Sequence, residues 1–220
     1  MSYRSGVARP LRPLSGALAA LSLFLASACD EFGGGPRTVS GSGYRATLAF
    51  TPSERYEIAV RGVRQRVSGE FDGGELVKIL RPDLGKMWQF RPAKQKVLES
   101  PFTPGEELVP GYPLEPHFDP VAYAERFGGR VERIDDAAHG MHPCERFQMT
   151  MPSGDRAVLW VARDLERLVV RIEHSKKDPK DEYQAITDTQ LLDIRLGASA
   201  KLFEKPSGYT AVRSYEGLAR

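Results

Sequence analysis

Two histidines, a methionine and a cysteine fall within one short stretch, HGMHPC at residues 139–144. Imidazole, thioether and thiol groups are soft ligands that suit Cu(I) or Zn²⁺. The spacing matches no standard metal-site pattern, and Pro143 stiffens the backbone between His142 and Cys144. We therefore interpret this stretch as a surface turn that leads into a strand, with Cys144 buried as a small apolar side chain. His139, His142 and Cys144 are kept only as weak metal-site candidates.

The sequence carries none of the motifs that identify the common enzyme sites. It has no GxSxG elbow, HExxH pair, P-loop or dinucleotide-binding fingerprint. Asp135 and Asp136 are adjacent, and neighbours on a strand point to opposite faces, so they do not form an acid–base pair. We therefore predict a protein that is not an enzyme and has no cofactor.

The second cysteine, Cys29, follows a leader. Residues 1–28 contain a basic start, a largely apolar run at residues 17–25, and the small residues Ala26, Ser27 and Ala28. This is the pattern of a secretory signal peptide. The apolar run is too short to span a bilayer as a helix, which needs about 20 residues.

A cysteine directly after such a leader resembles the lipobox of bacterial lipoproteins. That pattern has Leu three residues before the cysteine, where this chain has Ala26, and Leu25 stands one residue earlier. The resemblance implies that Cys29 is acylated, with palmitate among the chains, and anchors the protein in the bacterial cell envelope facing the periplasm. The sequence leaves undecided whether the anchor lies in the inner or the outer membrane. An ordinary secreted protein, with a chance cysteine at this position, remains the alternative. Residues 29–43, rich in Gly and Ser, are predicted to be a flexible tether.

The rest of the chain has the composition of a globular domain. Of 220 residues, 41% are apolar and 27% charged, which supports one domain with a real core. Three of the 31 basic residues lie in the leader, which has no acidic residue, so the remainder is close to neutral. A nucleic-acid partner would need a concentrated positive surface, and none is visible. We assign the domain to residues 44–212 and a tail to residues 213–220.

Alternation of apolar and polar side chains predicts a mainly β body of about ten strands. Its centre is residues 76–100, where three short apolar runs are separated by turn-forming stretches, as in an antiparallel meander. An open antiparallel sheet of this size must curl or pack on something. The other predicted strands are 44–51, 55–61, 63–71, 130–134, 144–151, 156–162, 168–174 and 183–196, with a turn at 135–140.

Residues 119–128 form the one clear helix. Asp119 suits the N-cap, Pro120 the first helical position and Gly128 the end. Tyr123 and Phe127 lie four residues apart, so they share a face that could cover the sheet. The preceding residues 100–116 contain five prolines and are predicted to be a loop, which in a compact domain is usually functional or a lid.

Several soft motifs, taken in order, resemble the LolA/LolB-type lipoprotein-carrier superfamily over residues 44–212, and in particular its uncharacterised periplasmic branch similar to outer-membrane-lipoprotein-sorting proteins. They are RPDL at 81–84, KxW at 86–88, Pro92, CxxF at 144–147, WVA at 160–162 and LFExPxGY at 202–209. The resemblance implies an open antiparallel half-barrel with one or few helices on its concave side and a cavity that takes acyl chains. No ligand-handling residue of the family is carried over.

Together these features predict a membrane-anchored envelope lipoprotein that binds a lipid or other hydrophobic ligand, in lipid or lipoprotein trafficking. The candidate cavity-lining residues are Trp88, Phe90, Tyr123, Phe127 and Trp160, for each of which plain core packing stays open. The alternative is a non-enzymatic sensor or interaction protein on the same scaffold. It would contact an envelope protein partner through the sheet or through residues 101–116.

Overall fold

The computed structural model describes residues 38–219 apart from 72 and 179–181. The predicted signal peptide, Cys29 and the first part of the tether lie outside the described residues. Helix α1 (Val39–Ser42) is short; the Thr38 side chain caps it by accepting a hydrogen bond from the Gly41 N–H, and Val39 is buried. The end of the segment predicted as a tether is therefore part of the packed body.

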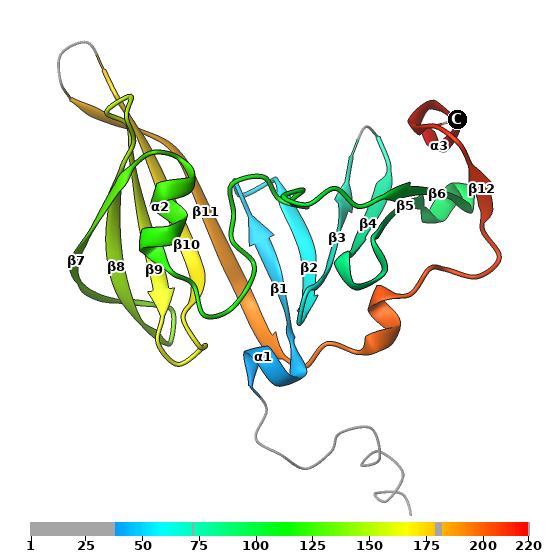
Figure 1. Ribbon diagram of the computed structural model, residues 1–220, viewed down its shortest axis with the longest axis horizontal. Coiled ribbons are helices and arrows are strands. Elements are labelled where there is room, and N and C mark those ends of the chain that lie inside the picture. Colours follow the sequence, from blue (N-terminus) through cyan, green and yellow to red (C-terminus); the bar gives the residue numbers. More distant parts are fainter. Residues whose placement is uncertain (1–37, 72, 179–181, 220) are drawn as a thin grey trace, which may run out of the picture. The chain divides into compact units, whose positions relative to one another are not determined.

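Twelve strands form one open sheet (Figure 1). Their order across the sheet is β12-β6-β5-β4-β3-β2-β1-β11-β10-β9-β8-β7. All neighbouring pairs are antiparallel except β12, which runs parallel to β6. Because β7 and β12 remain at the two edges, the sheet is not closed. The predicted mainly β, open architecture with few helices is confirmed.

The strands span β1 (Tyr44–Ala49), β2 (Arg55–Arg61), β3 (Arg64–Glu70), β4 (Glu75–Arg81), β5 (Lys86–Arg91), β6 (Lys96–Pro101), β7 (Arg130–His139), β8 (His142–Thr150), β9 (Arg156–Ala162), β10 (Leu168–Lys177), β11 (Tyr183–Leu196) and β12 (Thr210–Val212). The predicted meander is β4, β5 and β6. Its first turn is a 3₁₀ turn at Pro82–Leu84 closed by Gly85 at φ 63°, a left-handed conformation that glycine adopts without strain. Arg81 donates two 2.8 Å hydrogen bonds to Asp83 and so fixes this turn.

Strand β7 is longer than predicted. A turn was expected at residues 135–140, but β7 stays paired with β8 from Arg130 to His139, past a register shift between Arg133 and Asp136. The prediction of a turn there is wrong. The polar run is tolerated because β7 is an edge strand whose exposed side chains reach water and form ion pairs, such as Asp136 with Arg163.

Helix α2 (Pro120–Arg126) begins as predicted. The Asp119 carboxylate accepts hydrogen bonds from the N–H groups of the first turn at 2.8 and 3.2 Å, and Pro120 occupies the first helical position. Tyr123 is buried, whereas Phe127, at the end of the helix, is 40% exposed. Their rings lie 5.1 Å apart. Tyr123 therefore faces the sheet and Phe127 lies at the margin of the helix.

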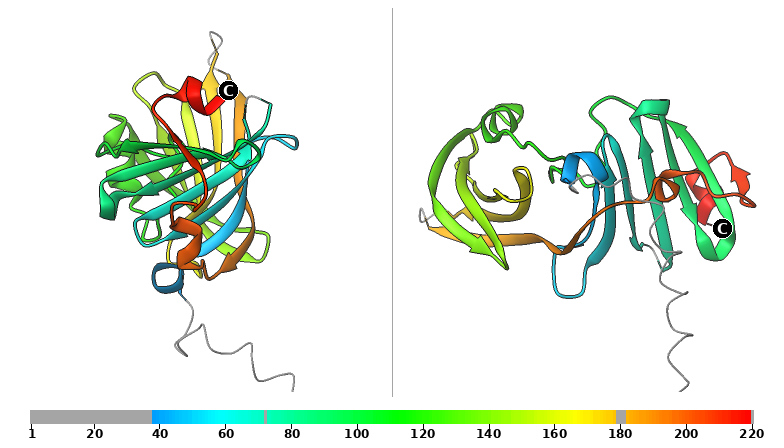
Figure 2. Two further views of the ribbon diagram at one scale, coloured as in Figure 1. Left: turned by 90° about the vertical axis from the view of Figure 1, so that its right-hand side faces the viewer. Right: turned by 90° about the horizontal axis from the view of Figure 1, so that it is seen from below.

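Both faces of the sheet are covered. The larger core includes the fully buried Tyr44 and Leu48 and is covered by residues 102–118 and α2. The smaller core lies on the opposite face of β2 to β6 and is covered by residues 198–209, from which Phe203 is buried. Figure 2 shows the two covering segments, green and orange, on opposite sides of the sheet.

The C-terminal part ends in structure rather than in a plain tail. The 3₁₀ helix Ala200–Phe203 precedes β12, and α3 (Tyr215–Ala219) follows it. Leu218 of α3 is fully buried. No helix among the described residues is both long and apolar enough to cross a bilayer.

Candidate functional site

Residues 102–119, called the strap below, join β6 to α2 and run across one face of the sheet (Figure 1). The Phe102 N–H donates to the Gly85 carbonyl at 3.0 Å, which ties the start of the strap to the β4–β5 turn. The N–H groups of His117 and Phe118 donate at 2.6 and 3.2 Å to carbonyls of the β9–β10 turn. The strap is therefore fixed to the sheet at both ends.

Three tyrosine hydroxyls hold the middle of the strap and the helix that follows it. They donate to backbone carbonyls, from Tyr44 to Leu114 (2.8 Å), from Tyr112 to Val169 (3.0 Å) and from Tyr123 to Gly111 (2.5 Å). Burial raises the pKa of all three phenols, that of Tyr123 to about 12. The hydroxyls therefore stay protonated and act as donors at any physiological pH.

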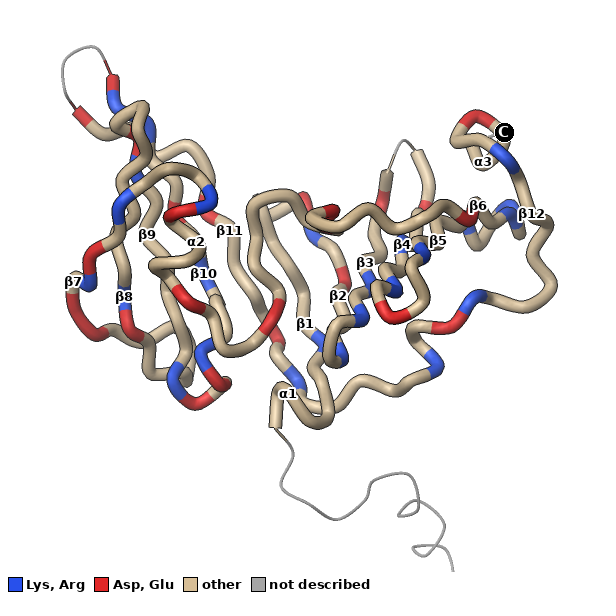
Figure 3. The backbone as a smooth tube through the Cα atoms, viewed as in Figure 1, with Lys and Arg blue, Asp and Glu red and all other residues tan. Residues whose placement is uncertain are grey.

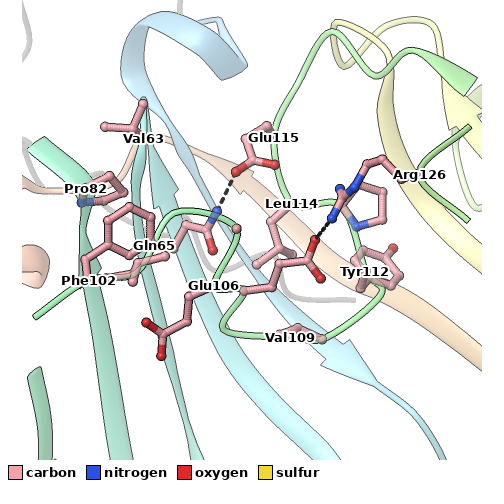
Figure 4. A pocket seen from close by; sticks show the side chains of 14 residues that line it. Val63, Gln65, Pro82, Phe102, Glu106, Val109, Tyr112, Leu114, Glu115 and Arg126 are labelled. Carbon is pink, nitrogen blue, oxygen red and sulfur yellow. Dashed lines mark hydrogen bonds and ion pairs between the residues drawn. The ribbon is translucent and has the colours of Figure 1, made fainter. Parts of the chain in front are cut away.

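A cleft of about 400 Å³ lies between the strap and strands β3 and β4 (Figure 4). One side is apolar, from the β2–β3 turn, the β4–β5 turn and the start of the strap. The other carries carboxylates and one guanidinium. The lining residues are Val63, Gln65, Leu80, Pro82, Phe102, Gly105, Glu106, Glu107, Val109, Tyr112, Pro113, Leu114, Glu115 and Arg126.

The polar side of the cleft is only partly neutralised. Glu107 forms an ion pair with Arg126 at 2.6 Å, and this hydrogen bond raises the pKa of Arg126. Glu115 accepts a 2.6 Å hydrogen bond from the buried amide of Gln65. Glu106 accepts only a strap backbone N–H, at 3.3 Å, and forms no ion pair with any described residue. Such a cleft suits an amphiphilic molecule whose head group carries hydrogen-bond donors or positive charge.

Trp88 and Phe90 lie on the other face of the sheet. Both belong to the smaller core under residues 198–209. The Trp88 indole N–H donates to Glu99 at 3.0 Å, and the Phe90 ring lies 5.5 Å from the Tyr209 ring, edge to face. They share a side, as predicted, but that side is separated from Tyr123 by the sheet.

Trp160 belongs to the larger core and lies between two arginines. Arg146 on β8 and Arg171 on β10 are its cross-strand neighbours, and their guanidinium carbons lie 4.9 and 5.1 Å from the indole centre. The five candidate cavity residues do not form one site: Trp88 and Phe90 belong to the smaller core, Tyr123 and Trp160 belong to the larger core, and Phe127 packs against Tyr123. None of the five lines the cleft.

The weak metal-site candidates point to separate partners. His142 Nδ1 lies 2.9 Å from Asp164, His139 Nε2 lies 3.4 Å from the Leu191 carbonyl, and the Cys144 thiol donates to the His142 carbonyl at 3.4 Å. Burial lowers the pKa of His139 and raises that of Cys144. Within the part of the chain that the structure describes, no three His, Cys, Asp or Glu side chains are grouped to hold a metal ion.

Several residues of the cleft were not identified from the sequence. In the sequence, Gln65 and Leu80 fit the alternating pattern of strands, and Arg126 fits the exposed surface of a helix, so nothing marks them as site residues. The available signal was the run of prolines at residues 100–116, which predicted a functional loop or lid without naming the side chains it covers. The strap is that loop.

No family model matches this chain, and no curated protein matches it in sequence. Among solved structures, an uncharacterised conserved protein from Thermus thermophilus matches with a TM-score of 0.50 at 10% identity, over 78% of this chain and 90% of that one. This likeness is one of fold alone.

Two further matches carry names from the superfamily that the sequence resembles. An outer membrane lipoprotein-sorting protein domain from Vibrio parahaemolyticus has a TM-score of 0.21 at 13% identity, over 74% of this chain and 89% of that one. A LolA superfamily protein from Nitrosomonas europaea has a TM-score of 0.19 at 12% identity, over 74% and 88%. At these TM-scores the two superpositions carry no argument about this chain.

Proposed function

We propose that the protein is an envelope lipoprotein, anchored through acylated Cys29, whose body binds a small hydrophobic or amphiphilic ligand in the cleft beneath the strap. The observation that carries the proposal is the cleft itself, whose volume of about 400 Å³ falls in the range of small-molecule sites. The leader and lipobox-like sequence supply the proposed anchor and envelope location.

Apolar burial would supply the binding energy. Phe102 and Leu80 stand on the apolar side of the cleft, and each 100 Å² of apolar surface removed from water contributes about 2.5 kcal/mol. The head group would lie against Glu106 and Glu115, which accept hydrogen bonds. No Ser, Cys, His or Lys lines the cleft, so its described residues offer no nucleophile paired with a base, and we propose binding rather than catalysis.

The face of the sheet beneath the strap is filled by buried side chains, which limits the size of the ligand that can bind there. Leu114 and Phe118 of the strap are buried against the larger core, where an acyl-chain cavity was expected from the resemblance. A ligand of one or two chains would have to occupy the cleft or displace part of the strap. A role in lipid or lipoprotein trafficking remains part of this proposal.

The proposal is tested with the Cys29→Ser chain, which cannot be acylated at that position. Native mass spectrometry of the protein purified from a periplasm should show a bound lipid or amphiphile, and a fluorescent fatty acid or fluorescent alkylamine should bind and be displaceable. Because the cleft carries carboxylates, we expect the alkylamine to bind more tightly than the fatty acid.

Two phenylalanines provide a matched pair of variants. Phe102→Ala removes an apolar wall of the cleft and should weaken probe binding about ten- to a hundredfold, since burying such a side chain contributes roughly 1.5–3 kcal/mol. Phe127→Ala removes a ring outside the cleft and should leave binding unchanged. No adduct and no displaceable probe, or equal losses in the two variants, would count against the cleft as the site.

A second candidate function is a sensor or interaction protein on the same scaffold. The packing of this face favours it, because Tyr44, Leu48 and Leu114 are buried in the larger core and fill space that an acyl chain would need. Crosslinking in the envelope separates the two candidates. One stoichiometric protein partner would support the interaction role, whereas bound lipid without such a partner would support the binding role.

A further inference from the structure

The connections at one end of the sheet expose apolar tips. Because the strands are antiparallel, their connections alternate between two ends, and the β2–β3, β4–β5 and β7–β8 turns lie at the end where α1 enters the sheet (Figure 1). These turns expose Val63 (54%), Leu84 (50%) and Met141 (87%). We call this end, with its turns and α1, the α1 end.

The turns at the opposite end differ. They are residues 50–54, 71–74, 92–95 and 151–155, between β1 and β2, β3 and β4, β5 and β6, and β8 and β9, together with the β10–β11 connection, of which the structure describes only residues 178 and 182. Among their described residues there is no exposed large hydrophobic side chain. The exposed large hydrophobic residues closest to this end, Tyr183 (36%) and Ile186 (58%), belong to strand β11 and not to a turn, so among the described turns the exposed apolar tips are at the α1 end.

Basic side chains accompany the apolar tips. Arg45 on β1 and Arg195 on β11 are directly opposite each other in the ladder, and both are exposed. No described carboxylate forms an ion pair with either of them or with Lys201. Two like charges in facing positions destabilise a sheet, a cost that an anionic surface would offset. Figure 3 shows blue segments around the entry of α1 into the sheet.

Glu57 of β2 and Asp193 of β11 line one pocket together with Arg45 and Arg195, although neither carboxylate forms an ion pair with these arginines. Other carboxylates at this end are already engaged. Asp83 accepts hydrogen bonds from Arg81 and Arg64, and Glu166 accepts the Ser40 backbone N–H at 3.0 Å. Asp83 and Glu166 therefore do little to cancel the charge of Arg45 and Arg195, whereas Glu57 and Asp193 offset part of it. The combination of exposed apolar tips with exposed cations that form no ion pair is typical of surfaces that bind at the membrane interface.

The chain itself limits how far this end can lie from a membrane. Cys29 is nine residues before Thr38, which caps α1. A fully extended chain of that length reaches at most about 32 Å. An acyl group on Cys29 would therefore keep the α1 end within that distance of the lipid surface.

We propose that the α1 end docks on the surface of an anionic bilayer, with Leu84 and Met141 entering the interfacial layer and Arg45 and Arg195 against lipid phosphates. The inference rests on the proposed anchoring through Cys29 and deepens it, since it fixes which end of the body faces the lipid. It also places the mouth of the cleft, which Val63 helps to line, next to the membrane.

The test uses the unacylated Cys29→Ser chain and vesicles of phosphatidylcholine with phosphatidylglycerol, in a co-sedimentation assay. Leu84→Ser with Met141→Ser should weaken vesicle binding about tenfold or more, because apolar insertion is lost without a change of charge. The matched control is Phe127→Ser with Ile186→Ser, which removes exposed apolar side chains outside the α1 end and should leave binding unchanged. Val63 is left intact because it also lines the cleft.

A charge variant completes the test. Arg45→Gln with Arg195→Gln should remove most of the preference for phosphatidylglycerol vesicles over pure phosphatidylcholine vesicles. The docking proposal is overturned if the Cys29→Ser chain does not bind anionic vesicles, or if the control pair loses as much binding as the Leu84 and Met141 pair. An intact mass showing unmodified Cys29 in the wild-type protein would instead refute the anchoring, so the two failures are distinguishable.

Discussion

The hydroxyl of Tyr44 tests how the strap is held. Tyr44 is fully buried on β1, and its hydroxyl donates a 2.8 Å hydrogen bond to the Leu114 carbonyl in the strap. The substitution Tyr44→Phe keeps the ring and leaves almost no cavity, but it takes the donor away from a buried carbonyl. An unpaired buried polar group costs about 1–3 kcal/mol, so we expect the free energy of unfolding to fall by that amount.

Urea denaturation, monitored by circular dichroism, measures this change as a lower midpoint concentration of urea with an unchanged m value. If the lost hydrogen bond destabilises the strap alone, amide hydrogen exchange in the strap should accelerate about ten- to a hundredfold. Exchange in β9 and β10 should then stay unchanged. The matched control is Tyr56→Phe, whose hydroxyl donates at 2.8 Å to the exposed Glu54. That variant should change stability by less than about 0.5 kcal/mol.

The reasoning is refuted if the two variants lower stability equally, since the cost would then not come from the buried Leu114 carbonyl. It is also refuted if Tyr44→Phe destabilises the protein without any change in strap exchange relative to the sheet. In that case the hydroxyl would support the global fold and would not hold the strap.

Three further predictions concern other parts of the body. Hydrogen bonds from two lysines and a tryptophan lower the pKa of Glu99 from 4.5 to about 2, so its contribution to stability is present above pH 4.5 and is lost as the pH falls towards 2. In Glu99→Gln, the free energy of unfolding measured with urea should depend less on pH between 4.5 and about 2. An unchanged pH dependence over that range would contradict this. The Cys144 thiol is buried and its pKa is raised, so in the Cys29→Ser chain it should react with an aromatic disulfide reagent only after unfolding; rapid labelling of the native protein would show the thiol to be accessible. Gly43→Ala should be strongly destabilising, because φ is +71° and a Cβ would lie 2.1 Å from a β2 carbonyl. Gly62→Ala, at φ +56° with no atom within 4 Å, should cost only about 1–2 kcal/mol, and equal shifts of Tm in the two variants would disprove the role of the close contact.

The sequence alone determined the local elements. The predicted strands at residues 156–162 and 183–196 coincide with β9 and β11, and the meander at residues 76–100 is β4 to β6. Asp119 and Pro120 begin α2 as expected. These features depend on alternation, turns and caps that act within a few residues, so neighbouring residues are enough to specify them. Alternation failed at β7, where an edge position and ion pairs support a strand without an apolar side, and it did not predict the three-residue edge strand β12.

The tertiary structure decided which layer covers each face and where the cleft lies. In β4 both faces are apolar, with Leu76 and Leu80 on one side and Val77 and Ile79 on the other. Alternation therefore assigned Trp88 and Phe90 to one side but could not say that residues 198–209 cover it.

The cleft depends on the same kind of long-range packing. Its walls come from β3, β4, the strap and α2, and the Gln65–Glu115 hydrogen bond joins residues 50 positions apart. Contacts at such separations are chosen by how whole segments pack, and no local pattern encodes them.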